Sequence, residues 1–317
     1  MAVVPAALPG VRTLSAAARA VLSPSGAAGV AVEAAWATAH LAVYPWGLVG
    51  STRTAMANRY RLEGLRPVQR GLLIRDVEAA GTPILLVHGM VDNRSVFTLL
   101  RRDLLRRGFG QVTTVNYSLL TNDVRAAARQ LSAQVEAIVA ETGYERIHVV
   151  GHSLGGLVAR YYVQRLGGHE RVHTLVTLGS PHQGTLMAHL LPTTLCRQLR
   201  PDSDLLRELA EPAPECTTRV VSYWSDLDHM VVPQRNGRVV HPDLAVRNVL
   251  VRGVGHMSLP IHGRIAHEIT TALSELDRDG HTLTEGVTPL GAERPRGRHR
   301  PSRGRRPAQR PGRRTTA

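Results

Sequence analysis

Three segments that lie far apart in the chain carry residue types that could together perform nucleophilic catalysis. In the first, GHSLG at 151–155, Ser153 stands between two glycines at the spacing G-x-S-x-G. A serine hydroxyl is a weak nucleophile near neutral pH, so it needs a base to accept its proton and an acid to orient that base. The other two segments lie downstream and contain aspartate and histidine. The set therefore predicts acyl-group chemistry through a serine nucleophile.

The candidate base is His256, which lies in the glycine-rich segment GVGHM at 253–257, just before a predicted amphipathic helix. The candidate acids are Asp226 and Asp228, in the loop that follows a predicted strand over 219–224. Both aspartates precede His256, and a serine, then an acid, then a histidine is the chain order typical of this chemistry. We favour Asp228 as the acid because an apolar run follows it, and we keep Asp226 as the alternative acid.

Negative charge that develops on a substrate oxygen needs two backbone N–H donors aimed at it. Leu154, directly after the serine, would supply one donor. Met90 would supply the other, because it follows the apolar run over 83–87 that predicts a buried strand. His88 and Gly89 are supporting residues: His88 directly follows the strand, and Gly89 would permit a close approach to the substrate.

The residues on either side of Ser153 predict a sharp strand-to-helix corner. Residues 146–150 are mostly apolar and indicate a buried strand, whereas 154–166 place apolar residues at helical spacing. At such a corner the serine hydroxyl projects from the carboxyl edge of a sheet. A Cβ at Gly151 or Gly155 would collide with the neighbouring strand or helix, so both glycines are expected to support the corner.

Strands and helices alternate along most of the chain. Further strands are predicted over 71–77, 83–87, 111–117, 172–178, 219–224 and 247–252, and further helices over 95–107, from a cap at Asn122 or Asp123 to Gly143, and over 261–276. This alternation predicts an α/β fold with a mostly parallel, doubly wound sheet and helices on both faces. Residues 181–218 interrupt the alternation with several prolines and are a candidate cap or lid, with a plain surface excursion as the alternative.

Basic residues are concentrated near the end of the chain. The formal net charge of the 317 residues is +14, and residues 293–317 hold ten arginines and a single glutamate. Because this segment lacks apolar residues to bury, we expect 281–317 to be a disordered, solvated tail. Such a tail could bind anionic lipid, cell-wall polymer or nucleic acid. We do not expect a nucleic-acid partner, because all basic residues are arginine throughout the chain, which suggests codon bias rather than a phosphate-binding surface.

The residues before the predicted domain divide into two parts. We expect 1–26, which contain several prolines, to be poorly ordered, and 27–69 to form an N-terminal helical segment. Residues 27–50 are largely apolar, but Glu33 and Pro45 weaken a transmembrane or signal-peptide interpretation. A helix that packs on the domain, or that makes peripheral membrane contact through 27–50, fits better.

The two cysteines do not determine the cellular compartment of the protein. Cys196 and Cys216 lie in the same irregular region. A disulfide between them would suit an exported protein, and two free thiols would suit a reducing compartment. A secreted or membrane-associated location is favoured over a cytoplasmic one.

Four motifs together resemble the bacterial triacylglycerol lipase/esterase family of the α/β-hydrolase superfamily. They are, in chain order, LVHGM at 86–90, GHSLG at 151–155, LGSPHQGT at 178–185 and GVGHM at 253–257. Their order matches the family as well as their content, and the resemblance extends over about residues 70–275. We therefore place an α/β-hydrolase domain at 70–280.

The resemblance implies a triad of Ser153, Asp228 and His256, with oxyanion donors at Met90 and Leu154. It also implies hydrolysis of carboxylic esters, with acyl or lipid esters as substrates, through an acyl-enzyme intermediate and without a metal or an organic cofactor. An acyltransferase with the same triad is one alternative. A non-catalytic binding protein that works through its basic tail is another.

Overall fold

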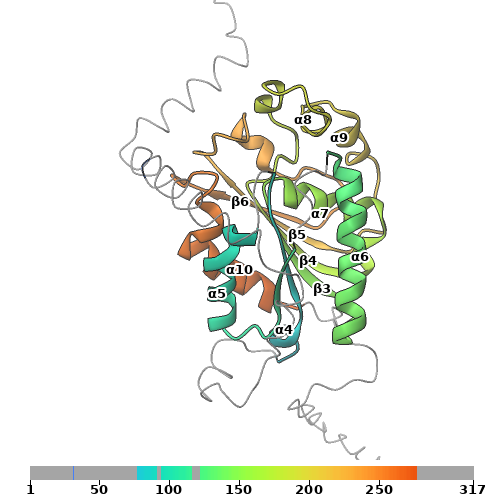
Figure 1. Cartoon of the computed structure of the whole chain (residues 1–317), viewed down its shortest axis with the longest axis vertical. Helices are drawn as coiled ribbons and strands as arrows, with labels where there is room; N and C mark the ends of the chain where they lie inside the picture. The colour runs from blue at the N-terminus through green and yellow to red at the C-terminus, as the bar shows by residue number, and fades with distance from the viewer. Residues whose placement is uncertain (1–30, 32–76, 91–93, 116–121, 277–317) are drawn as a thin grey trace, which may run out of the picture. The chain divides into compact units, whose positions relative to one another are not determined.

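The computed structural model describes residues 31, 77–90, 94–115 and 122–276 (Figure 1). In these residues six strands form one parallel sheet in the order β2-β1-β3-β4-β5-β6. The strands are β1 (Ile84–Val87), β2 (Val112–Val115), β3 (Ile147–His152), β4 (Val172–Leu178), β5 (Arg219–Ser225) and β6 (Val246–Val251). The predicted α/β fold with a mostly parallel sheet is therefore confirmed.

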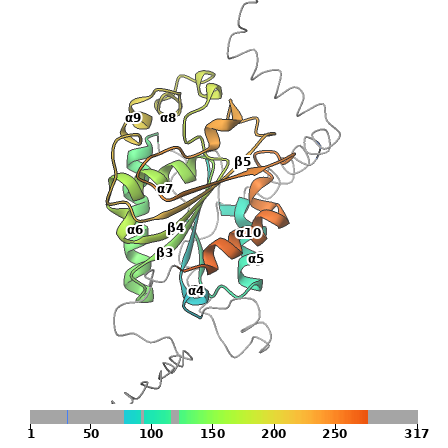
Figure 2. The ribbon, with the colours of Figure 1, turned by 180° about the vertical axis from the view of Figure 1, so that it is seen from behind.

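The sheet is doubly wound because the chain reverses direction after β2. From β1 the chain builds β2 on one side, then crosses over to β3 on the other side and continues outward to β6. The main helices are α5 (Thr98–Arg106), α6 (Val124–Thr142), α7 (Leu154–Arg165) and α10 (Gly263–Ser274). Helices α5 and α10 cover one face of the sheet and α6 and α7 cover the other (Figures 1 and 2). The reversal lies between β1 and β3, which is where ligand sites form in sheets of this kind.

Alternate residues of β1 enter two separate cores. Leu85 and Val87 pack in the cluster beneath α6 and α7, whereas Ile84 and Leu86 pack in the cluster beneath α5 and α10. All four side chains are fully buried. Burying each contributes about 1.5–3 kcal/mol. A strand covered on both faces has no solvent side, which explains why its sequence is a continuous apolar run.

Helix α6 has the boundaries that its sequence predicts. The Asp123 carboxylate accepts a hydrogen bond from the backbone N–H of Ala126 at 2.7 Å and so caps the first turn. At the other end Gly143 has a φ of 73°, a left-handed conformation that glycine adopts without a steric cost.

One predicted strand is wrong where the structure can test it. The prediction placed Val77 in a strand over 71–77, but Val77 begins a short helix, α4 (Val77–Gly81). The helix carries Ala79 into the core and its last turn is closed by Thr82, whose hydroxyl donates to the Glu78 carbonyl at 2.9 Å. Alanine and glutamate favour a helix here, and this local preference outweighs the apolar pattern. Residues 71–76 lie outside the described residues.

Residues 181–218 contain three short helices, which are joined by turns and irregular segments. They are the 3₁₀ helix η5 (Leu186–His189), α8 (Thr194–Gln198) and α9 (Asp204–Glu208). Other 3₁₀ turns are η3 (Arg94–Phe97), η4 (Gly168–Glu170), η6 (Gln234–Gly237) and η7 (Leu259–Ile261). Cys196 and Cys216 are buried free thiols, so this structure contains no disulfide between them.

Three predictions concern residues almost wholly outside the described ones: those for 1–26, for 27–69 with its membrane contact through 27–50, and for 281–317. Among the helices that are described, none is both long enough and apolar enough to cross a lipid bilayer.

Candidate active site

Ser153 occupies the corner between β3 and α7 in a conformation that is rare for a residue with a side chain. Its φ is 54° and its ψ is −124°. In the described residues only Asp202 is another non-glycine residue with positive φ. The corner is held by a hydrogen bond from the Ser153 N–H to the Leu178 carbonyl at 2.8 Å. Backbone strain of this kind persists where the surroundings enforce it, and it is concentrated at functional sites.

Two glycines make the corner sterically possible. A Cβ on Gly151 would lie 2.5 Å from the backbone of Gly156, and a Cβ on Gly155 would lie 2.2 Å from the carbonyl oxygen of Val87. Both distances are far below van der Waals contact, and both partners are backbone atoms that cannot move aside. The close approach of α7 to β1 and β3 therefore requires glycine at both positions.

Parallel pairing brings the candidate residues to one edge of the sheet. Val87 pairs with Gly151, His152 with Leu178, and Ser225 with Val251, so the strands end almost level. The loops after β1, β3, β5 and β6 consequently emerge at the same carboxyl edge. These loops hold the four groups of residues that the sequence singles out.

His256 and Asp228 form a buried hydrogen-bonded pair at this edge. The imidazole Nδ1 of His256 lies 2.8 Å from Oδ2 of Asp228. His256 is 2% exposed and Asp228 is 1% exposed. The other carboxylate oxygen, Oδ1, accepts from the backbone N–H groups of Met230 and Val231 at 2.8 and 2.9 Å. The carboxylate is thus fixed on both sides.

The surroundings of Asp228 keep it ionised. Burial opposes the charge, but the neighbouring His256 and the two backbone N–H donors outweigh burial and hold the pKa of the Asp228 carboxyl below its ordinary value. A carboxylate that stays charged can orient the imidazole and stabilise it when it becomes positive.

Asp226, the alternative acid, lies elsewhere in the same loop. Its Oδ1 accepts a hydrogen bond from the N–H of Gly253 at 2.8 Å, so it ties the loop after β5 to the loop after β6. The structure therefore brings Asp228, and not Asp226, against the ring of His256.

The loop after β1 approaches the serine closely. A Cβ on Gly89 would lie 3.0 Å from the Cβ and 3.5 Å from the Oγ of Ser153. His88 is buried and its Nδ1 donates to the Gly89 carbonyl at 2.9 Å. Met90 is half-buried beyond this glycine, and Leu154 is buried at the start of α7. Both proposed N–H donors thus belong to segments that adjoin Ser153.

Gly179 is a residue whose role the sequence does not reveal. It follows β4 with a φ of 58°, and a Cβ there would lie 3.0 Å from Oδ2 of Asp228 and 3.1 Å from Nδ1 of His256. A larger residue would push the acid and the histidine apart. The only sequence signal is a glycine at the end of a buried strand, directly before Ser180 and Pro181.

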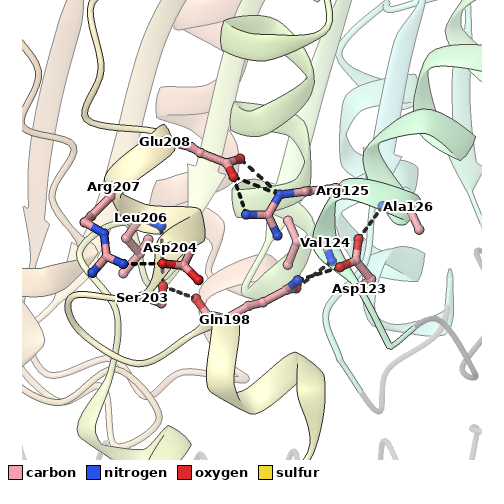
Figure 3. Close-up of polar contacts among 10 residues, drawn as sticks. All are labelled: Asp123, Val124, Arg125, Ala126, Gln198, Ser203, Asp204, Leu206, Arg207 and Glu208. Carbon is pink, nitrogen blue, oxygen red and sulfur yellow. Dashed lines mark hydrogen bonds and ion pairs between the residues drawn. The ribbon is translucent and has the colours of Figure 1, made fainter.

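Polar side chains join residues 181–218 to the helices beside the serine. Figure 3 shows Gln198 of α8 at the start of α6, where its Oε1 accepts from the Val124 N–H at 2.8 Å and its Nε2 donates to Asp123 at 2.5 Å. Nearby, Arg125 of α6 makes a two-pronged ion pair with Glu208 of α9 (Figure 3). This pair lowers the pKa of the Glu208 carboxyl.

A buried arginine makes a further connection to the same region. The Arg160 guanidinium, on α7, donates to the carbonyls of His182 and Leu209 at 3.1 and 3.0 Å. Burial lowers its pKa to about 10. Residues 181–218 are thus attached to both α6 and α7.

Within the described residues, no group of three His, Cys, Asp or Glu side chains is arranged to hold a metal ion.

Comparisons with known proteins agree with this architecture. A family model described as palmitoyl protein thioesterase matches residues 83–234. A triacylglycerol lipase from Pseudarthrobacter phenanthrenivorans is 30% identical over 121 residues, which cover 36% of this chain and 37% of that protein. A triacylglycerol lipase from Vibrio cholerae is 32% identical over 114 residues, which cover 34% of this chain and 35% of that protein. The matches span about a third of the length of these curated relatives.

A solved structure shows the same fold. Lipase B from Aspergillus fumigatus superposes with a TM-score of 0.55 at 17% sequence identity, covering 64% of this chain and 54% of that one. Together with the sequence matches, this likeness shows that the chain has an α/β-hydrolase fold and is similar over part of its length to triacylglycerol lipases.

Proposed function

We propose that this protein hydrolyses carboxylic esters of acyl or lipid type, with Ser153 as nucleophile, His256 as base and Asp228 as the acid that orients the base. The observation that carries the proposal is the buried 2.8 Å hydrogen bond between His256 Nδ1 and Asp228 Oδ2, at the sheet edge where Ser153 stands on its strained corner. The triacylglycerol lipases among its relatives support an ester substrate.

In the first half of the reaction, the Ser153 hydroxyl attacks the ester carbonyl carbon. His256 Nε2 takes the hydroxyl proton, while Asp228 holds the Nδ1–H on the opposite side of the ring and stabilises the resulting positive charge. The N–H groups of Leu154 and Met90 donate to the oxygen that becomes negative. Each such donor contributes on the order of 10²–10³ in rate.

His256 then returns this proton to the departing alcohol, which completes the first half and leaves an acyl group on Ser153. In the second half, water attacks the acyl group, His256 takes a proton from the water, and it gives that proton to the Ser153 oxygen as the acid is released. No hydrogen bond joins the Ser153 hydroxyl to His256 in the described part of the chain. Such contacts are often long in the absence of substrate and tighten when it binds.

The test is Ser153→Ala, assayed on a panel of p-nitrophenyl esters from short to long acyl chains. Because the nucleophile is removed, kcat should fall on the order of 10⁴–10⁶-fold on every ester that the native protein cleaves. A thermal unfolding curve like that of the native protein would show that the fold is intact. Turnover within tenfold of the native rate would overturn the proposal.

Thioester hydrolysis is the second candidate, because the matching family model is described as palmitoyl protein thioesterase. The match covers Ser153 and Asp228 and ends before His256. The attack and the acyl-enzyme are the same, and only the leaving group differs. A palmitoyl thioester and a palmitoyl oxygen ester of otherwise equal structure should be compared by kcat/KM. A preference for the thioester would support this candidate, and a preference for the oxygen ester would support the first.

A further inference from the structure

The residue directly before the serine makes an unexpected contact with the base. His152 ends β3, and its Nε2 lies 3.1 Å from the backbone carbonyl oxygen of His256. A carbonyl oxygen only accepts hydrogen bonds, so Nε2 must carry the hydrogen and donate it. His152 is 1% exposed and His256 is 2% exposed. This buried bond connects two residues that are 104 positions apart in the chain.

The contact differs from the other bonds that hold the His256 loop. Asp226 binds the N–H of Gly253, and the Ser225 hydroxyl donates to the carbonyl of Val254. Both of those bonds fix the first part of the loop to the end of β5. The bond from His152 instead fixes the backbone of His256 itself to β3, the strand that carries the serine.

The two anchors of His256 act on different parts of the residue. Asp228 holds the ring through Nδ1 at 2.8 Å, and His152 holds the backbone carbonyl. The ring of His152 also lies beside that of His256, with 4.9 Å between centroids and 43° between planes. A ring in this place leaves the His256 imidazole little room to swing away. With backbone and ring both held, the direction in which Nε2 of His256 points is set relative to β3.

We propose that His152 is a positioning residue that sets the distance between the base His256 and the nucleophile Ser153, through its hydrogen bond to the His256 carbonyl. The inference rests on the proposed function, because it assumes that His256 accepts the proton of Ser153. A displacement of about 1 Å between reacting groups can cost on the order of 10²-fold in rate. The bond joins His152, which directly precedes the nucleophile, to the backbone of the base His256, so it can prevent such a displacement.

The test compares two substitutions of similar length. In His152→Gln, the amide nitrogen is separated from Cα by as many bonds as Nε2 of histidine and can still donate. In His152→Met, the side chain is about as long but has no donor. We expect His152→Met to lower kcat about 10–100-fold with KM changed less than about threefold. The glutamine variant should recover most of the loss.

A matched control lies on the same strand. His148 is also buried in β3 but makes no contact with His256 or Asp228 in the described residues. His148→Met should therefore leave kcat within about twofold of native, whatever it does to thermal stability. This control separates the loss of a buried histidine from the loss of the contact to the base.

The outcomes are distinct. A native kcat in His152→Met, or equal losses in the methionine and glutamine variants, would overturn the positioning role. Ser153→Ala is assayed alongside. If Ser153→Ala remains active, the proposed function fails. If Ser153→Ala is inactive but His152→Met is fully active, only the role of His152 is refuted. Should the methionine variant not fold, a native kcat in His152→Asn, whose shorter amide falls short of the carbonyl, would refute it as well.

Discussion

Two histidines that are buried at opposite ends of the sheet have opposite surroundings. At the amino end, His148 of β3 and His173 of β4 meet edge to face, with 5.5 Å between ring centroids. At the carboxyl end, His256 is hydrogen-bonded to the carboxylate of Asp228. His148, His173 and His256 are each at most 3% exposed, so burial alone does not distinguish the two places.

The difference lies in the neighbouring charges. Burial, reinforced by the positive charges of His173, Arg219 and Arg146, holds the pKa of His148 well below its ordinary value. His256 instead faces an ionised carboxylate, which stabilises a positive imidazole. A buried histidine is therefore suited to accept a proton only where the fold supplies a negative partner. In a parallel sheet, the loops at the carboxyl ends provide the freedom to place one.

The largest expected effect comes from removing that negative partner. Asp228→Asn should lower kcat for ester hydrolysis on the order of 10⁴-fold, because an amide does not stabilise the imidazolium and favours the wrong ring tautomer. Asp226→Asn is the matched control from the same loop, and we expect it to cost less than about tenfold. Steady-state kinetics of both variants would show which aspartate is the acid. A larger loss in the Asp226 variant would reverse the assignment.

The burial of His148 at the amino end of the sheet should affect how protein stability depends on pH. Because the folded pKa of His148 lies below the unfolded value of about 6.5, the unfolded chain binds a proton that the folded chain rejects. Stability is then lost as the pH falls below about 6.5, by up to about 1.4 kcal/mol per pH unit for one proton. His148→Gln should flatten the fall of the melting temperature between about pH 7 and pH 5.

The control for this measurement is His189→Gln, which changes an exposed histidine in η5. Its melting temperature should follow the native pH dependence. If both variants follow the native curve, burial at the amino end does not govern acid stability.

The smallest effect on stability is expected at the contact between α6 and α9. Arg125 and Glu208 form an ion pair whose side chains are 26% and 34% exposed, so water screens the pair in part. A double-mutant cycle with Arg125→Met and Glu208→Gln should give a coupling energy of about 0.2–1 kcal/mol in urea unfolding. Ester hydrolysis should change less than about threefold. A large loss of kcat would mean that an ionic contact outside the triad also controls the chemistry.

Much of the fold could be predicted because its signals are local. The caps of α6 at Asp123 and Gly143 are read from neighbouring residues, since capping acts within one turn. The corner at Ser153 can likewise be predicted from Gly151 and Gly155, because only glycine permits the close backbone approach there. The strand predicted at Val77 failed because a short apolar stretch does not by itself distinguish a strand from a helix.

The order of strands and helices, and the motifs around the serine, the acid and the histidine, follow from the amino-acid sequence alone because each depends on residues near one another. The three-dimensional structure was needed to show which aspartate lies against His256, why Gly179 lacks a side chain, and that His152 donates to the His256 carbonyl. These contacts join loops from different strands. Their partners are set by the parallel register of the sheet, which no short stretch of sequence contains.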